Sequence, residues 1–154
     1  MLHSIKTTQF LNSTINDVWD FMSDPGNLKT ITPPYMQFQV LSKNTAMYAG
    51  QIIEYKVRPL LGIQLSWVTE ITHIVEGSYF VDEQRFGPYS FWHHQHFIKP
   101  VTGGVEMTDI VHYKIPLGII GRIMNSLFIK KQLNDIFLYR RSRLDELFNT
   151  KMSK

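Results

Sequence analysis

Two histidines and a tryptophan alternate along residues 87–97, and they are the side chains of this sequence best suited to chemistry. The segment after Pro88 has the character of a β-strand, in which successive residues point to opposite faces. Trp92, His94 and His96 are therefore predicted to share one face. An imidazole pair beside an indole can bind a ligand or move a proton if that face is enclosed.

An aspartate on a later strand has the parity of an apolar face. Asp109 alternates with Met107, Val111 and Tyr113, all of which are expected to point inward. A buried carboxylate is costly unless it is paired, protonated or solvated by cavity water. We therefore expect Asp109 to have a polar partner inside the protein.

Hairpin geometry predicts that partner. The hairpin with the following strand is expected to place His94 opposite Asp109 and His96 opposite Met107, and the hairpin with the preceding strand places His94 opposite Asp82. Directly opposed residues have Cβ atoms about 4.5–5.5 Å apart. The sequence thus predicts a row of Asp82, His94 and Asp109 on the apolar face.

This row has three interpretations. His94 is a candidate general base or acid, oriented by Asp82 or Asp109. Alternatively, the row is a buried polar network whose members satisfy one another. His94-x-His96 beside a carboxylate also has the donor types of a transition-metal site, but this spacing alone does not specify a metal. We expect no metal and no cofactor.

Alternating hydrophobicity and short turns predict one antiparallel sheet. The expected strands are at about 2–11, 36–43, 50–58, 63–76, 78–86, 91–98 and 104–115. Helical periodicity predicts a short helix over 15–22 capped by Ser13, another over 25–31, and a long helix over 118–148 with a kink near 128–132.

The long helix is the only element large enough to cover one face of such a sheet. The predicted class is α+β, with a curved seven-stranded antiparallel sheet around a long C-terminal helix and two short helices after the first strand. No linker or repeat interrupts residues 1–154, so we expect a single domain. His73 has the inward parity of Trp67, whereas His93 and His112 are expected to point outward.

Composition excludes several classes of function. The 154 residues carry a formal charge of +3, too small to indicate nucleic acid binding, and contain no cysteine for disulfides or thiolate chemistry. No apolar run is long enough for stable membrane insertion, and the first residues lack the features of a signal peptide, so a cytoplasmic location is expected. Phosphate-loop and serine-hydrolase motifs are also absent.

Basic residues gather on the last predicted helix, where a solvated face is the expected role. They are Arg122, Lys130, Lys131, Arg140, Arg141 and Arg143. Tyr139, which lies among them, is a candidate to close one end of a cavity.

Several short motifs together resemble a known superfamily over nearly the whole chain. They are Phe21-x-x-Asp24-Pro25-x-Asn27-Leu28, Ile31-Thr32-Pro33-Pro34, Trp67-x-Thr69-Glu70-Ile71, Phe80-x-Asp82-x-Gln84, Gly87-Pro88, Trp92-x-His94-x-His96 and Tyr139-Arg140-Arg141. The sequence resembles bacterial ligand-binding members of the START/polyketide-cyclase/Bet v 1-like (SRPBCC) superfamily. The resemblance implies a helix-grip fold but no particular reaction, because the superfamily includes lipid carriers, hormone receptors and cyclases.

We expect this protein to bind a small hydrophobic or amphipathic molecule between the sheet and the C-terminal helix. The predicted ligand-binding residues are Tyr55, Trp67, Asp82, Gln84, Trp92, His94, His96, Asp109 and Tyr113. A polyketide cyclase- or dehydratase-like enzyme that uses His94 with Asp82 or Asp109 is one alternative. The other is a regulatory module that binds an unidentified protein partner through its outer surface.

Overall fold

The computed structural model describes residues 1–154 except 44, 61–62, 117, 120–127 and 151–154. The strands are β1 (His3–Leu11), β2 (Gln39–Val40), β3 (Gln51–Leu60), β4 (Ile63–Val75), β5 (Tyr79–Phe86), β6 (Phe91–Val101) and β7 (Gly104–Lys114). The helices are α1 (Ile15–Met22), the 3-10 turns η1 (Pro25–Lys29) and η2 (Pro34–Met36), α3 (Lys130–Leu144) and a π-helical end, η4 (Asp145–Asn149).

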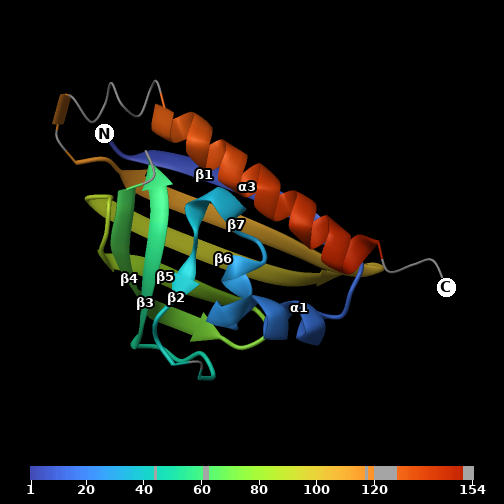
Figure 1. Ribbon diagram of the computed structural model, residues 1–154. Coiled ribbons are helices and arrows are strands. Elements are labelled where there is room, and N and C mark those ends of the chain that lie inside the picture. The colour runs from blue at the N-terminus through green and yellow to red at the C-terminus, as the bar shows by residue number, and fades with distance from the viewer. Residues whose placement is uncertain (44, 61–62, 117, 120–127, 151–154) are drawn as a thin grey trace.

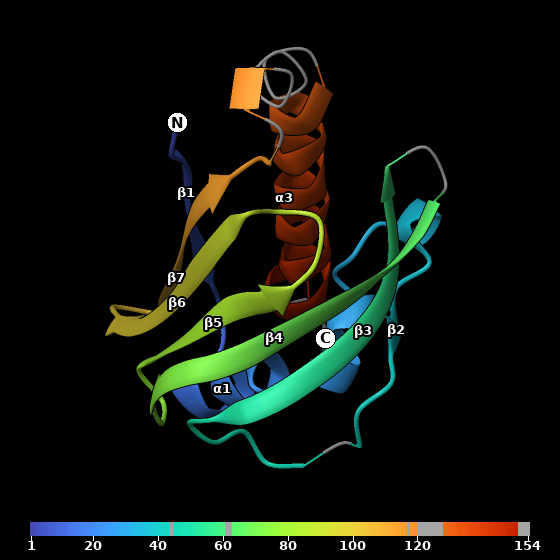
Figure 2. The same ribbon diagram turned by 90° about the vertical axis from the view of Figure 1, so that its left-hand side faces the viewer.

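Within these residues, the strands form one antiparallel sheet in the order β1-β7-β6-β5-β4-β3-β2. Figures 1 and 2 show that α3 lies along the inner side of this sheet, which curves around the helix. The predicted helix-grip arrangement is confirmed. β2 is much shorter than the predicted strand over 36–43, because η2 ends in a left-handed residue, Gln37 (φ 44°), that turns the chain.

Helix α1 spans the predicted residues, but its N-cap differs from the predicted one. Thr14, not Ser13, is the N-cap, and its hydroxyl accepts a hydrogen bond from the Asp17 backbone N–H at 3.2 Å. Val18 and Met22 are among the residues that α1 buries against the sheet. The helix therefore packs against β6 and β7, near the lower end of α3 in Figure 1.

Two groups of buried apolar side chains lie inside the fold. One packs α1 and the C-terminal part of α3 against the sheet, and includes Val18, Ile98 and Leu144. The other packs Trp92 and Phe137, with their neighbours, between β6, β7 and the N-terminal part of α3. Along β6, the stretch between Trp92 and Ile98 holds the two inward histidines, so a polar region separates the two apolar ones.

The last helix can be compared with its prediction only in part. The expected apolar stripe of Ile120, Ile123 and Leu127 lies outside the described residues. Residues 128–129 form a wider, π-helical turn that leads into α3. Residues 128–132, where the kink was expected, belong to the described part of the chain, but residues 120–127 before them do not, so the kink stays a prediction.

A bulge in β4 overturns the prediction for His73. The register between β4 and β5 shifts between Ile71 and His73, so residues on either side of the shift change face. Ile74 packs against the core, and His73 is exposed. The prediction that His73 points inward was wrong for this reason.

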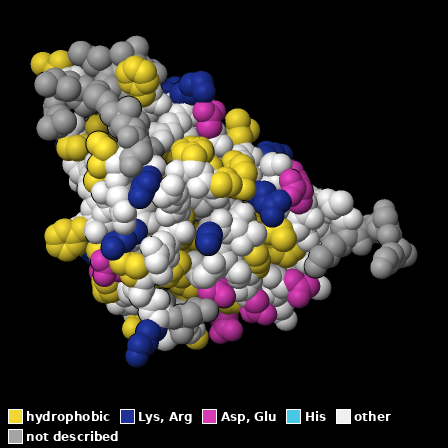
Figure 3. Space-filling view, in the orientation of Figure 1, with side chains coloured by type: hydrophobic (Ala, Val, Ile, Leu, Met, Phe, Trp, Pro, Cys, Tyr) yellow, Lys and Arg dark blue, Asp and Glu magenta, His cyan; other side chains and the backbone are white. Residues whose placement is uncertain are grey.

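The outer face of α3 carries charges of both signs. Lys131 Nζ lies 2.8 Å from Asp135 Oδ2, and Arg143 pairs with Glu146. Figure 3 shows basic and acidic side chains close together over the face on which α3 lies. None of the helices in the described part of the chain has the length and apolarity that a membrane span requires.

Candidate functional site

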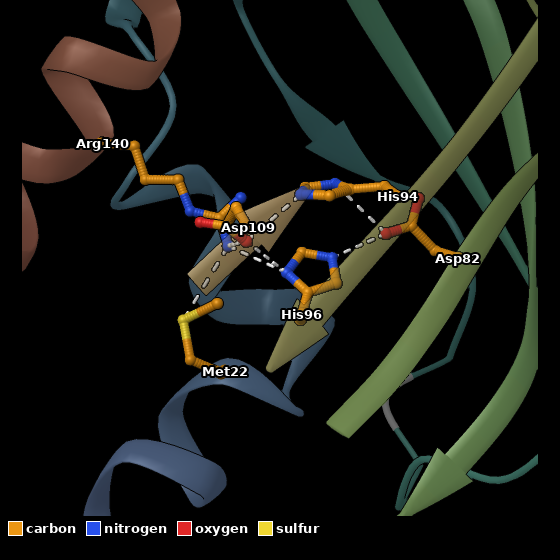
Figure 4. Close-up of polar contacts among 6 residues, drawn as sticks. All are labelled: Met22, Asp82, His94, His96, Asp109 and Arg140. Carbon is orange, nitrogen blue, oxygen red and sulfur yellow. Dashed lines mark hydrogen bonds and ion pairs between the residues drawn. The ribbon is translucent and has the colours of Figure 1, made fainter. Parts of the chain in front are cut away.

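Four strand positions and one helix position bring five polar side chains together inside the fold. Asp82 comes from β5, His94 and His96 from β6, Asp109 from β7 and Arg140 from α3 (Figure 4). Strand pairing sets their order, because Asp82 lies opposite His94 and His96 lies opposite Asp109. We refer to these five residues as the polar cluster.

Each imidazole in the polar cluster spans the two carboxylates. Asp82 Oδ2 lies 3.4 Å from His94 Nδ1 and 2.8 Å from His96 Nε2. Asp109 Oδ1 lies 3.2 Å from His94 Nε2 and 2.8 Å from His96 Nδ1. All four ring nitrogens therefore face a carboxylate oxygen, and the two ring centroids are 3.7 Å apart.

Arg140 supplies a buried positive charge from α3, and the prediction that it lies on a solvated face was wrong. The residue is only 8% exposed. Its Nη2 lies 3.5 Å from Asp109 Oδ1, 3.4 Å from His96 Nδ1 and 4.0 Å from Met22 Sδ. Within the described residues, its Nε–H has no hydrogen-bond partner.

The cluster fixes the protonation states of its members. Burial, with a contribution from His96, lowers the pKa of His94 to about 4, so His94 is neutral near pH 7. Burial opposes the charge on His96, but its hydrogen bonds to Asp109 and Asp82 raise its pKa. Burial also opposes ionisation of Asp109, but Arg140 and the two histidines hold its pKa well below the usual value.

Asp82 is ionised for a related reason. Burial would raise the pKa of its carboxyl group, and the two histidines, with Arg140, lower it. The two carboxylates thus face Arg140 and His96, whose raised pKa favours the protonated form, and His94 is a neutral member of the cluster. Opposite charges at these distances explain how a charged group is tolerated in the interior.

A cavity of about 170 Å³ lies between the sheet and α3, and the polar cluster forms part of its wall. The other lining side chains are mostly apolar. They include Met22, Leu28, Ile31, Met36, Phe38, Met47, Ile53, Tyr55, Val57, Trp67, Ile71, Phe80, Tyr89, Trp92, Leu133, Ile136 and Phe137. The cavity therefore combines an apolar wall with one concentrated polar region.

The structure places six of the nine predicted ligand-binding residues on the cavity wall. They are Tyr55, Trp67, Asp82, Trp92, His94 and His96. Asp109 lies behind the two imidazoles and borders a smaller space next to β1 and α3. Tyr113 is 1% exposed and packs beside Trp92 with ring centroids 6.4 Å apart.

Gln84 has a positioning role at the end of β5. Its Nε2 donates to the Tyr89 carbonyl oxygen at 2.6 Å, and its Oε1 accepts from the Tyr89 N–H at 3.3 Å. A Cβ atom at Gly87 would displace the Gln84 amide from Tyr89, and the positive φ of Gly87 (156°) also disfavours other residues there. Gln84 thereby orients Tyr89, whose ring lines the cavity next to Trp92.

One predicted register was wrong by two residues. The β6–β7 turn is tighter than expected, since Val101 pairs with Gly104. His96, rather than His94, therefore lies opposite Asp109. The predicted pairing of Asp82 with His94 is correct.

The sequence interpretation also missed several wall residues. Tyr89, Phe137 and Met22 had no role assigned to them, although the helical spacing of Leu133, Phe137 and Arg140 puts all three on one face of α3. That spacing was the available signal for an inward arginine. Tyr139, predicted to close the cavity, is not among its lining residues.

No family model and no curated protein matches the sequence. Solved structures match over almost the whole chain. Protein CV1439 from Chromobacterium violaceum is 16% identical, with 95% of this chain and 97% of that chain covered and a TM-score of 0.72. TTHA0849 from Thermus thermophilus is 13% identical over 98% of this chain and 100% of that chain, with a TM-score of 0.71.

The comparison also includes Ara h 8.0201, a Bet v 1 homologue. It is 12% identical, with 95% of this chain and 99% of that chain covered and a TM-score of 0.59. The fold is Bet v 1-like. At these identities the likeness establishes the fold alone, and the function must be argued from the cavity.

The protonation states predict how stability depends on pH. His94 is neutral in the folded protein and regains its usual pKa of 6.5 on unfolding. The free energy of unfolding should therefore fall by roughly 3 kcal/mol as the pH is lowered from about 6.5 to about 4. His96 acts with the opposite sign, because its raised pKa stabilises the fold at low pH and this contribution is lost as the pH rises through that pKa.

Urea unfolding at a series of pH values, with a chelator present, measures both effects. We expect His94→Gln to flatten the loss between pH 6.5 and 4, and His96→Gln to flatten the loss above pH 6.5. If His94→Gln loses as much free energy of unfolding between pH 6.5 and 4 as the parent protein, the assignment of a neutral His94 is contradicted. The buried aspartates contribute to acid unfolding only below about 3.8, their usual pKa, which keeps the windows apart.

Proposed function

We propose that this protein binds a small amphipathic molecule in the cavity between the sheet and α3. The observation that carries the proposal is the uneven wall of the cavity, which is apolar except where Asp82, His94, His96 and Arg140 meet. Cavities that hold small molecules combine an apolar lining with a few polar groups that fix orientation. The polar end of the ligand would face the polar cluster, and its apolar body would lie against the aromatic side chains.

An unused donor in the wall supports the proposal. The Trp67 indole N–H is shielded from solvent and has no hydrogen-bond partner within the described residues. Buried indole N–H groups usually have a partner, and leaving one unpaired is costly. Trp67 also lies edge-on to Trp92, at 5.2 Å between ring centroids and 89° between planes. A ligand acceptor beside this pair would satisfy the indole while contacting both rings.

The proposal places this protein with the ligand-binding members of the superfamily that its sequence resembles. A carrier and a receptor both require only a cavity that the ligand can enter and that matches its shape and polarity. Native mass spectrometry of the protein purified from its own host would identify a retained ligand. A stoichiometric small molecule that is released on denaturation is the expected result.

Filling the cavity provides a direct test. Leu133, 4% exposed, points from α3 into the cavity, whereas Leu138 on the same helix is 64% exposed. We expect Leu133→Trp to weaken binding of the apolar probe anilinonaphthalene sulfonate at least about tenfold, because the indole occupies the space of the probe. Leu138→Trp adds the same side chain outside the cavity and should leave affinity unchanged.

Probe fluorescence titrations on both variants give the answer, with far-UV circular dichroism to check folding. Equal affinities for Leu133→Trp and the parent protein would show that the probe binds elsewhere and would reject the cavity as the site. Displacement of the probe by a panel of fatty acids, phenols and polycyclic aromatics would then rank the chemistry of the natural ligand.

A second candidate function is acid–base catalysis on the bound molecule. The observation that favours it is the adjacency of two imidazoles with opposite pKa shifts on the cavity wall, His94 with a lowered pKa and His96 with a raised one. Such a pair can accept a proton and donate another, as a cyclase or dehydratase requires. In a carrier, His94→Gln should weaken binding slightly. In an enzyme, His94→Gln should retain binding and lose turnover.

A further inference from the structure

The cavity side of the polar cluster brings three metal-donor atoms together. Asp82, His94 and His96 each offer one donor atom, and these atoms all lie within 4.8 Å of one another. Donors around one ion with bonds of about 2.1 Å at tetrahedral angles are about 3.4 Å apart. Asp82 Oδ2 lies 3.4 Å from His94 Nδ1, which matches this separation. It lies 2.8 Å from His96 Nε2, so these two atoms must move slightly apart to bind one ion.

The second carboxylate lies where metal-binding histidines need one. The ring nitrogens that face away from Asp82, Nε2 of His94 and Nδ1 of His96, both lie against Asp109 Oδ1, at 3.2 and 2.8 Å. Histidine ligands commonly donate their outer N–H to a carboxylate, which fixes the tautomer and makes the inner nitrogen a better ligand. Here one buried aspartate serves both histidines, and Arg140 balances its charge.

Counting protons shows that the cluster has room for a cation. Four ring nitrogens face carboxylate oxygens, but each neutral imidazole has only one N–H to donate. With one added proton, His96 can donate to both aspartates, as described above. Without that proton, and with the N–H groups of His94 and His96 both donated to Asp109, the two lone pairs point toward Asp82. Lone pairs and a carboxylate converging on one point require a proton or a metal ion between them.

From this geometry we propose that Asp82, His94 and His96 form a binding site for a divalent transition-metal ion on the wall of the cavity. Two imidazoles and one carboxylate suit Zn²⁺, Co²⁺, Ni²⁺ or Fe²⁺, and are poor ligands for Mg²⁺ or Ca²⁺. Three protein ligands leave coordination positions open toward the cavity, as in metal sites that bind a small molecule. The site goes beyond the proposed organic ligand and does not depend on it.

The test uses the metal ion alone. Protein stripped with a chelator is titrated near pH 7 with Zn²⁺ by calorimetry and with Co²⁺ by visible absorption. We expect one ion per chain, a Co²⁺ spectrum typical of imidazole ligation, and release of protons on binding, because a ring nitrogen must lose its proton to bind. His94→Gln, His96→Gln and Asp82→Asn should each weaken binding by at least about 100-fold.

A histidine on the opposite face of the same strand provides the matched control. His93 Nδ1 lies 2.7 Å from Glu83 Oε1, and its ring is 6.3 Å from that of His112, so the outer face presents similar residue types. His93→Gln should bind both ions like the parent protein. If His93→Gln abolishes binding while His94→Gln does not, the ion binds the outer face and the proposal is overturned.

Asp109 is a positioning residue in this proposal, because it acts through the histidines. Asp109→Asn should still bind one Co²⁺ per chain with the same type of spectrum, but about 10–100-fold more weakly. Circular dichroism of each variant verifies that it is folded. Asp82 is the most exposed of the aspartates and histidines in the cluster. Asp82→Asn therefore remains informative if a histidine variant fails to fold. Failure of the folded parent protein to bind either ion saturably would also reject the site.

Discussion

Arg140→Met should lower the free energy of unfolding by about 3–5 kcal/mol. The methionine keeps much of the apolar stem but removes the guanidinium from Asp109, a carboxylate that is 3% exposed. Removing one partner of a buried ion pair leaves the other charge uncompensated, and this is what makes the change so costly. Urea unfolding followed by tryptophan fluorescence measures the loss.

Two neighbouring substitutions separate charge from packing. Arg141 follows in the sequence, is exposed, and donates to the Thr8 carbonyl oxygen at 3.3 Å, so Arg141→Met should lose no more than about 1 kcal/mol. Arg140→Lys retains the charge, so its loss of unfolding free energy should lie between those of Arg140→Met and Arg141→Met. The deficit of Arg140→Met should also shrink as the pH is lowered, because protonation of Asp109 removes the unpaired charge. A deficit equal to that of Arg141→Met would show that Asp109 does not rely on Arg140.

Trp92→Ala is expected to have a comparable effect, about 3–5 kcal/mol, for an apolar reason. The indole is 8% exposed, and its ring centroid lies 4.8 Å from that of Tyr89 and 5.2 Å from that of Trp67. It is also perpendicular to the His94 ring, at 6.1 Å. Truncation removes the transfer free energy of the ring and leaves a hole that the neighbours fill only in part.

The adjacent residue provides the control, since Phe91 lies on the other face of β6 and is 44% exposed. Phe91→Ala should lose less than about 1 kcal/mol in the same unfolding experiment. Trp92→Ala also enlarges the cavity next to the polar cluster, so folded protein should bind larger probes better than the parent protein does. Similar losses for the two variants would mean that β6 does not have the inward and outward faces described here.

The fold was predictable because many residues report on it together. Alternating hydrophobicity fixed the strands, short turns fixed the antiparallel pairing, and one long helix was left to cover the sheet. The alternation and the short turns recur along the chain, so an error in one strand does not change the predicted fold. The shortened β2 shows the limit, since a single left-handed residue, Gln37, delays the start of a strand that the alternation predicted from residue 36.

The prediction of the site depended on individual turns and registers. Two of these, the β6–β7 turn and the β4 bulge, could not be recognised in the sequence. The β6–β7 turn shifted the register by two residues, which preserved the inward face of His96 and Asp109 but changed which side chains are opposed. The β4 bulge changed parity and turned His73 outward. Arg140 was assigned to solvent on the basis of its charge, although its helical spacing from Leu133 and Phe137 indicated the interior.

The position of β1 in the sheet has a consequence for synthesis of the chain. β1 pairs along its whole length with β7, so Leu11 lies opposite Val105. At about 5–20 residues per second, a ribosome needs roughly 5–20 s to add the residues between them. During that interval the hairpins from β3 to β6 can form one after another, whereas β1 has no strand to join. We therefore expect β1 to join the sheet only after β7 has been synthesised, so that its pairing groups stay open to chaperones during that interval.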